Sequence, residues 1–354
     1  MEAATLQRKK LRSSRRSNAA AKSDFFDGLP DDLVVFVLCK LSSSASSPSD
    51  LINVLLTCKR LNRLGLHSLV LSQAGPKAFA IRAKNWSDSA HRFFKQCVTA
   101  GNIEASYTLG MIRFYCLQNR GSGVSLMAKA AMRAHALALY SLAVIQFNGS
   151  GYSKNDKDLR AGVALCARAA SLGHVDALRE LGHCLQDGYG VKQNVTEGRR
   201  LLVQANAREL ASVLRSSAAW RSHHYQHFYA CLTGLVSCPL LSDFGCNVPP
   251  PELHPANRFM REWFGSGRWM AGQGMRLCSH VGCGRPETRP HEFRRCSVCG
   301  TVNYCSRGCQ ALDWKLRHKV KCKPIERRLA VDGEAVEELG GLVEGEEGDN
   351  MAVG

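Results

Sequence analysis

Seven cysteines and one histidine near the end of the printed sequence constrain this chain more than any other feature. They form four close pairs within about 45 residues: Cys278 and Cys283, Cys296 and Cys299, Cys305 and Cys309, His318 and Cys322. Ligands separated by two to four residues can turn toward one ion, and four of them complete a tetrahedral zinc site. The cluster therefore predicts two closed, structural Zn²⁺ sites, whose metal would supply much of the folding energy of so small a module.

Two other chemistries fit the cluster less well. A disulfide framework is typical of secreted chains, whereas this cluster has an odd number of cysteines, and no secretory signal is recognisable near the start. A catalytic zinc site keeps one position open, and eight ligands for two ions leave none open. The run from Gln310 to Lys319 lacks Gly and Pro. We therefore expect a helix that places Cys305 near Cys309, and His318 near Cys322, on successive turns.

The end of the cluster resembles the MYND finger. The matching residues are Tyr304-Cys305-x3-Cys309-Gln310-x2-Asp313-Trp314-x3-His318-x3-Cys322. The resemblance covers residues 276–324 and implies that the pairs alternate between two zinc ions. Cys278, Cys283, Cys305 and Cys309 would hold the first ion, and Cys296, Cys299, His318 and Cys322 the second. MYND fingers usually bind short proline-containing peptides and are not themselves enzymes.

The finger is basic in a chain that is basic overall. The whole chain has a formal net charge of +17, and residues 276–328 contain 13 Lys or Arg against four Asp or Glu. With seven thiolates and two zinc ions included, about +6 remains. Such charge attracts acidic partners or nucleic acid, or keeps a small zinc domain soluble. Regularly interleaved aromatic residues are missing, so nucleic acid is the less favoured partner.

The two ends of the chain have opposite charge. Residues 1–22 hold seven basic residues and one acidic residue, and we expect a disordered arm in which the run from Arg8 to Arg16 is either a nuclear import signal or a solvated tail. Residues 325–354 are expected to form a disordered acidic tail that shields the finger. From residue 329 onward this tail has eight acidic residues and no Lys or Arg.

Residues 23–70 predict short apolar helices. Pro30 at a first helical position, two aspartates behind it and apolar residues at 33, 34, 37, 38 and 41 indicate an amphipathic helix. A serine-rich loop is expected at 42–49. Asp50 then caps a second helix that continues through Leu61 toward Leu66. Apolar surface of this kind predicts a protein partner.

These helices resemble the F-box. The motifs are Leu29-Pro30-x2-Leu33, Val37-Leu38-x2-Leu41, Asp50-Leu51 and Thr57-Cys58-Lys59-Arg60-Leu61, the last standing where the family has Val-Cys-Lys-x-Trp. The resemblance implies docking on a Skp1-type adaptor that tethers a cullin-RING ubiquitin ligase. The implied adaptor contacts are Leu29, Pro30, Leu33, Leu38, Leu41, Leu51, Cys58 and Leu61. The alternative is an ordinary helical hairpin packed on its own domain.

Residues 90–210 contain an imperfect repeat. An Ala-x3-Leu pattern begins at Ala105, Ala138 and Ala177, and Gly-x-Gly follows the last two patterns at 149–151 and 188–190. Alanine-rich helices are then expected at 161–170 and 197–207. The pattern resembles Sel1-like repeats, relatives of the tetratricopeptide family, which implies an α-α solenoid with a concave binding face. A phosphate-binding loop is excluded, because no strand precedes the glycines and no Lys-Ser/Thr follows them.

Residues 211–275 predict a helical connector. His223, His224 and His227 have no carboxylate or cysteine pattern to complete a site. The segment from His254 to Phe264 is expected to be a short helix whose aromatic residues dock the finger onto the solenoid. The nine cysteines outside the finger, including those at 231, 238 and 246, are expected to be buried and reduced.

The whole pattern predicts a mainly α chain and resembles plant F-box proteins that end in a MYND finger. This implies a non-catalytic, substrate-recruiting subunit of an SCF ubiquitin ligase, with a Skp1-type adaptor, cullin and an unidentified substrate protein as partners. The alternative is a nuclear scaffold or transcriptional co-regulator. A SET methyltransferase is excluded by the absence of its cofactor-binding motifs. No apolar run approaches the roughly 18 residues of a membrane span, and we expect the chain in the nucleus or cytoplasm.

Overall fold

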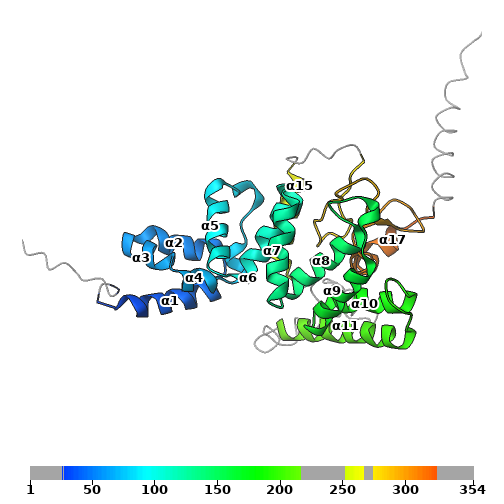
Figure 1. Cartoon of the computed structure of the whole chain (residues 1–354), viewed down its shortest axis with the longest axis horizontal. Coiled ribbons are helices and arrows are strands. Elements are labelled where there is room, and N and C mark those ends of the chain that lie inside the picture. The colour runs from blue at the N-terminus through cyan, green and yellow to red at the C-terminus, as the bar shows by residue number, and fades with distance from the viewer. Residues whose placement is uncertain (1–25, 27, 217–251, 267–273, 325–354) are drawn as a thin grey trace, which may run out of the picture.

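The computed structural model describes residues 26, 28–216, 252–266 and 274–324, which are mainly helical (Figure 1). The expected arm at 1–22 and tail at 325–354 lie outside the described residues, as do the histidines at 223, 224 and 227 and the cysteines at 231, 238 and 246. Within the described ranges, every helix is too short or too polar to cross a bilayer.

The first unit consists of four helices with a core of their own. They are α1 (Asp31–Ser44), α2 (Pro48–Thr57), α3 (Lys59–Gly65) and α4 (Ser68–Ser72). The core gathers Val34, Val35, Leu38, Leu51, Leu64 and Val70. Asp31 holds α1 against α3, because it accepts hydrogen bonds from Arg60 at 2.9 Å and from Arg63 at 2.7 Å.

The ends of these helices differ from the sequence prediction. Pro30 is the N-cap of α1, one position before the first helical turn, and α1 continues to Ser44. The Ser44 hydroxyl donates to the Lys40 carbonyl at 2.8 Å, so the serines extend the helix and the loop is only 45–47. Ser47 caps α2, with Asp50 closing a capping box at the third helical position.

The predicted second helix is also divided in two. Cys58 adopts an extended conformation between α2 and α3, and its Sγ accepts a hydrogen bond from the Leu61 amide at 3.4 Å. It therefore ends one helix and caps the next. The expectation of burial is wrong for Cys58, which is exposed, and for the half-buried Cys39. It is confirmed for Cys97, Cys116, Cys166 and Cys184.

A second core joins these helices to the repeats. It is built around η1 (Pro76–Phe79) and α5 (Asp88–Thr99), where the rings of Phe79 and Phe94 lie 5.2 Å apart. The short helix η2 (Ala83–Asn85) connects the two. Asn102 donates to the carbonyls of Leu71, Ser72 and Ala74 at 2.9–3.2 Å. The four-helix unit is thus packed and hydrogen-bonded to the first repeat.

Three helical hairpins follow, as the repeat pattern predicts. Their first helices are α6 (Ile103–Met111), α8 (Ala136–Asn148) and α10 (Val175–Asp187), and their second helices are α7 (Arg120–Met132), α9 (Leu159–Ser171) and α11 (Val195–Ser216). Each first helix has the same start: Asn102, His135 or His174 accepts a hydrogen bond from the amide three residues on. The repeat period is therefore visible in the capping residues as well as in the alanines.

The turns inside the hairpins follow the glycines. Gly149 and Gly151 have φ of 61° and 84°, and Gly188 and Gly190 have φ of 68° and 72°, a conformation that side-chain-bearing residues rarely adopt. The short helix η4 (Lys154–Asp156) follows the first of these turns. The first hairpin lacks the glycine pair. There the chain continues as a π-helical segment, η3 (Ile112–Cys116), and turns at Gln118 with φ of 57°.

Glycine also lets the helices of a hairpin cross closely. A Cβ atom on Gly123 of α7 would lie 2.7 Å from the Phe114 amide nitrogen and 2.8 Å from the Gly110 carbonyl oxygen. Gly182 and Gly198 face each other in the same way in the third hairpin, where a Cβ on Gly198 would lie 2.7 Å from the Gly182 carbonyl oxygen. Because these neighbours are backbone atoms, the crossing has no room for a side chain.

The helix α15 (Pro255–Gly265) confirms the short helix predicted from His254 to Phe264, and His254 is its N-cap. Its Phe259 packs on Trp86, with ring centroids 5.3 Å apart, so its aromatic residues contact the repeat side of the structure. Asn257 of the same helix donates to the Gly282 carbonyl of the finger at 3.3 Å. Phe259 and Phe264 belong to one apolar core with the repeats and with Cys278 and Cys283 of the finger, which is consistent with the predicted aromatic docking.

A partly buried carboxylate fixes α15 to the repeats. Glu104 of α6 accepts hydrogen bonds from His254 at 2.7 Å and from His135 at 3.1 Å. Burial alone would raise the pKa of Glu104, but these two hydrogen bonds lower it to about 2. The folded-state pKa lies below the ordinary 4.5, so this stabilisation is complete above pH 4.5 and is lost as the pH falls toward 2.

Two alanine substitutions in α7 test the close crossing. Gly123→Ala should lower the free energy of unfolding by about 1–3 kcal/mol, because its methyl group must displace backbone. Gly121→Ala, two residues earlier, meets nothing within 4 Å and should raise the free energy by about 0.5–1 kcal/mol through helix propensity. Thermal and denaturant unfolding measure both variants. Effects of the same sign would contradict the crossing.

Candidate metal centre and binding surfaces

A small hairpin and a bent helix position the eight predicted ligands. The strands β1 (Arg294–Arg295) and β2 (Asn303–Tyr304) pair antiparallel. The helical part consists of α16 (Arg307–Asp313), the π-helical turn η5 (Trp314–His318) and α17 (Lys319–Lys321). Cys296 and Cys305 each follow a strand directly, while Cys309 and His318 lie on the helical part. The ligands therefore come from both arms of the hairpin and from the helix beside it.

The helix prediction for the last two pairs needs correction. Cys305 lies before Ser306, the N-cap of α16, and so is outside the helix. His318 ends a π-helical turn, and Cys322 lies just after α17. The extra residue in that turn rotates the chain relative to a regular α-helix.

The structure brings the ligands together in two groups of four. One group is Cys278, Cys283, Cys305 and Cys309, and the other is Cys296, Cys299, His318 and Cys322. In each group all ligand atoms lie within 4.8 Å of one another. This is the alternating arrangement expected from the MYND resemblance.

The spacing of the donor atoms matches a tetrahedral metal. The Sγ atom of Cys305 lies 3.5 Å from Cys283 and 3.6 Å from Cys309, and Cys296 lies 3.9 Å from Cys322. Sulfurs bound at about 2.3 Å around one ion would be about 3.8 Å apart. None of the described cysteines is in a disulfide. Both groups are therefore compatible with zinc.

The two sites have different surroundings. All four ligands of the first site are buried, whereas Cys322 of the second is half-buried. In the second site burial alone would raise the pKa of Cys299, but hydrogen bonds from Thr301, whose hydroxyl lies 3.0 Å away, lower it to about 6. The first site is thus internal and the second lies nearer the surface.

The Asp of the Cys-Gln-x-x-Asp-Trp signature supports the hairpin from within. Asp313 is fully buried and accepts a hydrogen bond from the Tyr304 hydroxyl at 2.7 Å. Arg317 donates to the same carboxylate at 3.2 Å and to the Ser279 carbonyl at 2.7 Å. This network ties β2, the helical part and the loop after Cys278 together.

The finger is docked on the first helices of the second and third repeats. Asn148 of α8 donates to the Cys305 carbonyl at 2.8 Å, and Tyr140 donates to the Ser306 hydroxyl at 3.1 Å. Glu180 of α10 accepts the Arg307 and Gly308 amides at 2.8 and 3.2 Å, at the N-terminus of α16. Burial raises the pKa of Glu180, and the hydrogen bonds from these two amides offset part of that rise.

A loop of the finger also surrounds the glycine turn of the second repeat. The Gly151 amide donates to the Thr288 hydroxyl at 2.6 Å, and Arg289 donates to the Gly149 carbonyl at 2.9 Å. Buried Glu292 accepts from the Thr288 amide at 2.6 Å and from the Ser150 hydroxyl. The resemblance implied a concave binding face on the solenoid. The finger covers α8 and α10 instead, so this part of the solenoid is not a free surface.

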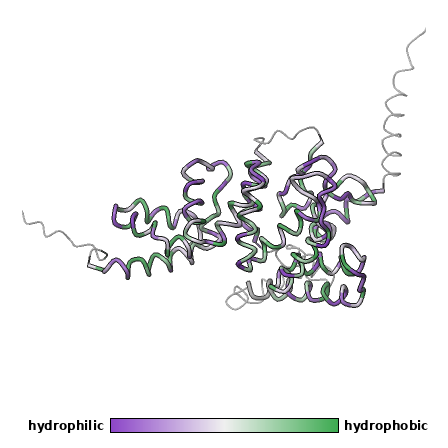
Figure 2. The backbone as a smooth tube through the Cα atoms, in the orientation of Figure 1, coloured by the Kyte–Doolittle hydropathy of each residue, from purple (hydrophilic) through white to green (hydrophobic). Residues whose placement is uncertain are grey.

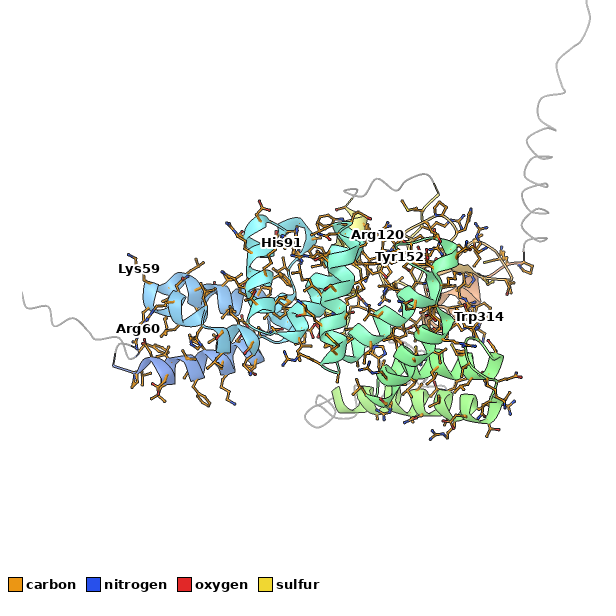
Figure 3. All side chains as sticks on the ribbon, viewed as in Figure 1. Lys59, Arg60, His91, Arg120, Tyr152 and Trp314 are labelled. Carbon is orange, nitrogen blue, oxygen red and sulfur yellow. The ribbon has the colours of Figure 1, made fainter. Side chains whose placement is uncertain are left out.

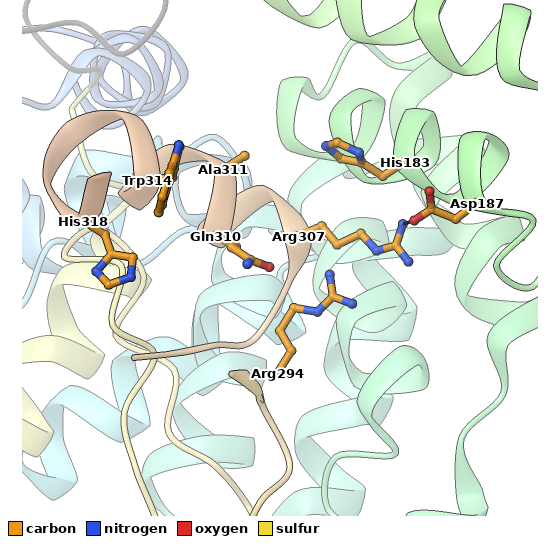
Figure 4. A pocket seen from close by; sticks show the side chains of 8 residues that line it. All are labelled: His183, Asp187, Arg294, Arg307, Gln310, Ala311, Trp314 and His318. Carbon is orange, nitrogen blue, oxygen red and sulfur yellow. Dashed lines mark hydrogen bonds and ion pairs between the residues drawn. The ribbon is translucent and has the colours of Figure 1, made fainter. Parts of the chain in front are cut away.

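A groove of about 310 Å³ remains between α10 and the finger (Figure 4). Its lining is His183, Asp187, Arg294, Arg307, Gln310, Ala311, Trp314 and His318. Arg307 is paired with Asp187, while the side chains of Arg294 and Gln310 have no hydrogen-bond partner among the described residues. Burial and the charge of Arg307 lower the pKa of His183. The groove thus offers one unpaired cation, one unpaired amide and the half-exposed Trp314 ring.

The predicted adaptor contacts fall into two classes. Pro30, Leu33 and Cys58 are exposed, and Leu29, Leu41 and Leu61 are half-buried. Leu38 and Leu51 lie in the core of the four-helix unit and support the fold from inside.

The apolar surface of this unit includes residues outside the predicted set of adaptor contacts. Phe36 on α1 and Leu56 on α2 are 60% and 77% exposed, and Val37 and Ile52 are also exposed. Figure 2 shows hydrophobic stretches on α1 and α2, at the end of the molecule remote from the finger. Helical periodicity predicted an apolar face on α1. The packing of α3 and α4 decides which of these apolar residues stay exposed to solvent.

Family models match three parts of the chain. Residues 77–161 match the plant tetratrico peptide repeats, residues 175–208 the Sel1 repeat and residues 278–322 the MYND finger. A Sel1 repeat protein from Oxalobacter formigenes resembles this chain with 21% identity and a TM-score of 0.31, covering 33% of this chain and 89% of that protein.

Two Arabidopsis thaliana proteins are similar over most of their length. F-box protein At1g67340 is 66% identical over 318 residues, which cover 87% of this chain and 83% of that protein. F-box protein At5g50450 is 63% identical over 334 residues, which cover 93% of this chain and 95% of that protein. The similarity therefore includes the four-helix unit, the repeats and the finger together.

The metal centre is tested by counting ions. We expect two zinc ions per chain in reduced protein, because each group of ligands holds one. Cys299→Ser removes a ligand of the second site only, and should leave about one ion and the repeats folded. Elemental analysis together with circular dichroism measures both. Protein without bound metal, or a variant that still holds two ions, would contradict the two-site arrangement.

Proposed function

Because the chain belongs to the plant F-box proteins that combine Sel1- and tetratricopeptide-type repeats with a C-terminal MYND finger, we propose that it is the substrate-recruiting subunit of an SCF-type ubiquitin ligase. In this role the four-helix unit binds a Skp1-type adaptor, and through it a cullin. Ubiquitin is transferred by other subunits, so this chain contributes proximity and no catalysis of its own.

The observation that carries the adaptor half of the proposal is the apolar surface of α1 and α2. Leu33, Phe36 and Val37 project from one helix and Ile52 and Leu56 from the next, although the unit already has a core of its own. Large apolar side chains left outside a complete core favour burial against another protein. The Arg60 and Arg63 contacts to Asp31 fix α3 against α1, which carries part of this apolar surface.

The target half of the proposal rests on the groove beside the finger. Arg60 and Trp314 lie at opposite ends of the molecule (Figure 3), so a target in the groove and an adaptor on α1 and α2 would not compete. Trp314 offers an aromatic surface, and Gln310 and Arg294 offer polar contacts with a peptide. We propose zinc as the ion in both sites. It would hold the hairpin and η5 in the arrangement that forms the groove.

The proposed compartment rests on the redox state of the cysteines. Thirteen described cysteines are free of disulfides, which suits a reducing environment. We propose that the chain works in the nucleus or cytoplasm, with the basic residues between Arg8 and Arg16 as the import signal for a nuclear fraction. A scaffold or co-regulator that gathers partners through the finger is the second candidate, since the groove alone would serve that role.

The adaptor surface is tested by charge substitution at its two most exposed residues. Phe36→Asp combined with Leu56→Asp should weaken capture of a purified Skp1-type adaptor by at least about tenfold, because two apolar contacts become buried charges. Val203→Asp is the matched control, since Val203 is 68% exposed on α11 and should not change capture. If the wild type fails to bind the adaptor, the ligase proposal falls and the scaffold becomes the better account.

The groove is tested by removing its aromatic surface. Trp314→Ala should reduce the set of ubiquitylated proteins that copurify with the chain from plant cells several-fold, while adaptor capture and metal content stay unchanged. Tyr152→Ala is the control, because Tyr152 is an exposed aromatic residue outside the groove. An unchanged set of ubiquitylated proteins would place target binding elsewhere on the chain.

A further inference from the structure

Arg285 is a buried cation at the boundary between the finger and the repeats. It is 5% exposed. Its Nη2 atom donates to the Ser141 hydroxyl of α8 at 2.9 Å, and the Tyr107 hydroxyl of α6 lies 3.4 Å from that same oxygen. Its backbone carbonyl accepts the Cys278 amide at 2.9 Å. One residue therefore touches the repeats with its side chain and the first metal site with its backbone.

The guanidinium also contacts the sulfurs of the first site. Its Nη1 atom lies 3.7 Å from Cys283 Sγ and 4.0 Å from Cys305 Sγ. No carboxylate among the described residues forms an ion pair with Arg285. A charge this deeply buried needs a counter-charge, because an unpaired buried charge is strongly destabilising.

The four cysteines of the first site would provide that counter-charge when they hold a zinc ion as thiolates. Zinc binds cysteine as thiolate, so four thiolates around Zn²⁺ carry a net charge of −2. Two of these sulfurs face Arg285. The second site is different, because the side chain that lies within hydrogen-bond distance of its Cys299 sulfur is Thr301, a neutral residue. The two metal sites are therefore unequal in their relation to the repeats.

We propose that Arg285 is a positioning residue that couples metal binding at the four-cysteine site to docking of the finger on α8. The thiolates hold the guanidinium inside the protein, and the guanidinium holds Ser141. Loss of the metal from the first site, the inner metal, removes the charge that keeps Arg285 buried, and so loosens the finger from the second repeat. Loss of the metal from the second site, the outer metal, leaves the contact between Arg285 and Ser141 in place. The coupling does not depend on the ligase role.

The test uses the full-length chain and the variant Arg285→Met, which keeps the length of the side chain and removes its charge. Transfer of metal from the four-cysteine site to a chromophoric chelator should become at least tenfold faster, while transfer from the second site should not change. Amide hydrogen exchange in residues 136–148 should rise several-fold. Cobalt substitution identifies the ion, because four-sulfur and three-sulfur–one-nitrogen sites have different absorption spectra. Arg295→Met removes an exposed finger guanidinium and should change neither readout.

Two further variants separate charge from packing. Arg285→Lys keeps the charge and should restore most of the metal retention, and Ser141→Ala should raise exchange in residues 136–148 without faster metal loss. Wild-type metal retention in Arg285→Met would overturn the proposal, whether or not exchange changes. If Arg285→Met does not fold, Cys299→Ser, which holds only the inner metal, is treated with chelator. Exchange in residues 136–148 that stays constant as that ion is lost would also overturn the proposal.

Discussion

The arrangement of this protein depends on polar groups that would be left unpaired if the finger and the repeats separated. Glu180 is buried against the N-terminus of α16, and its carboxylate accepts two backbone amides there. Glu292 is buried beside the glycine turn of the second repeat and accepts from Ser150. Unpaired buried carboxylates are costly, so these contacts bind the two parts more specifically than apolar packing alone. The finger is consequently an integral part of the fold.

Continuous packing extends this rigidity to the other end of the chain. The core of the four-helix unit adjoins a second core around Phe79 and Phe94, which reaches Leu109 of α6 in the first repeat. From there a third core continues through the repeats and α15 to the cysteines of the first metal site. In the proposed ligase role such a connection would matter, because the distance between the two binding ends would set the effective concentration of the target.

Much of this could be predicted from local signals. Ligand spacing predicted two zinc sites, and the MYND resemblance implied the grouping of the eight ligands in which the structure places them, while the glycine pairs led to two of the three hairpin turns. Helix ends were less accessible, because Ser44 and Asp50 can either continue or start a helix, and neighbouring hydrogen bonds decide. The polar contacts that dock the finger on α8 and α10 could not be predicted. Asn148 and Glu180 look like ordinary surface residues of amphipathic helices until their distant partners are known.

The covered face of α8 and α10 has a consequence for work with fragments. In the intact chain the finger occupies this face much as a bound ligand would, with loop 288–292 seated on the glycine turn. A fragment that ends before residue 252 would expose Asn148, Glu180 and Tyr140 without their internal partners. Interaction screens with such a fragment would then select proteins that imitate the finger. Baits for this protein should therefore contain the repeats and the finger together.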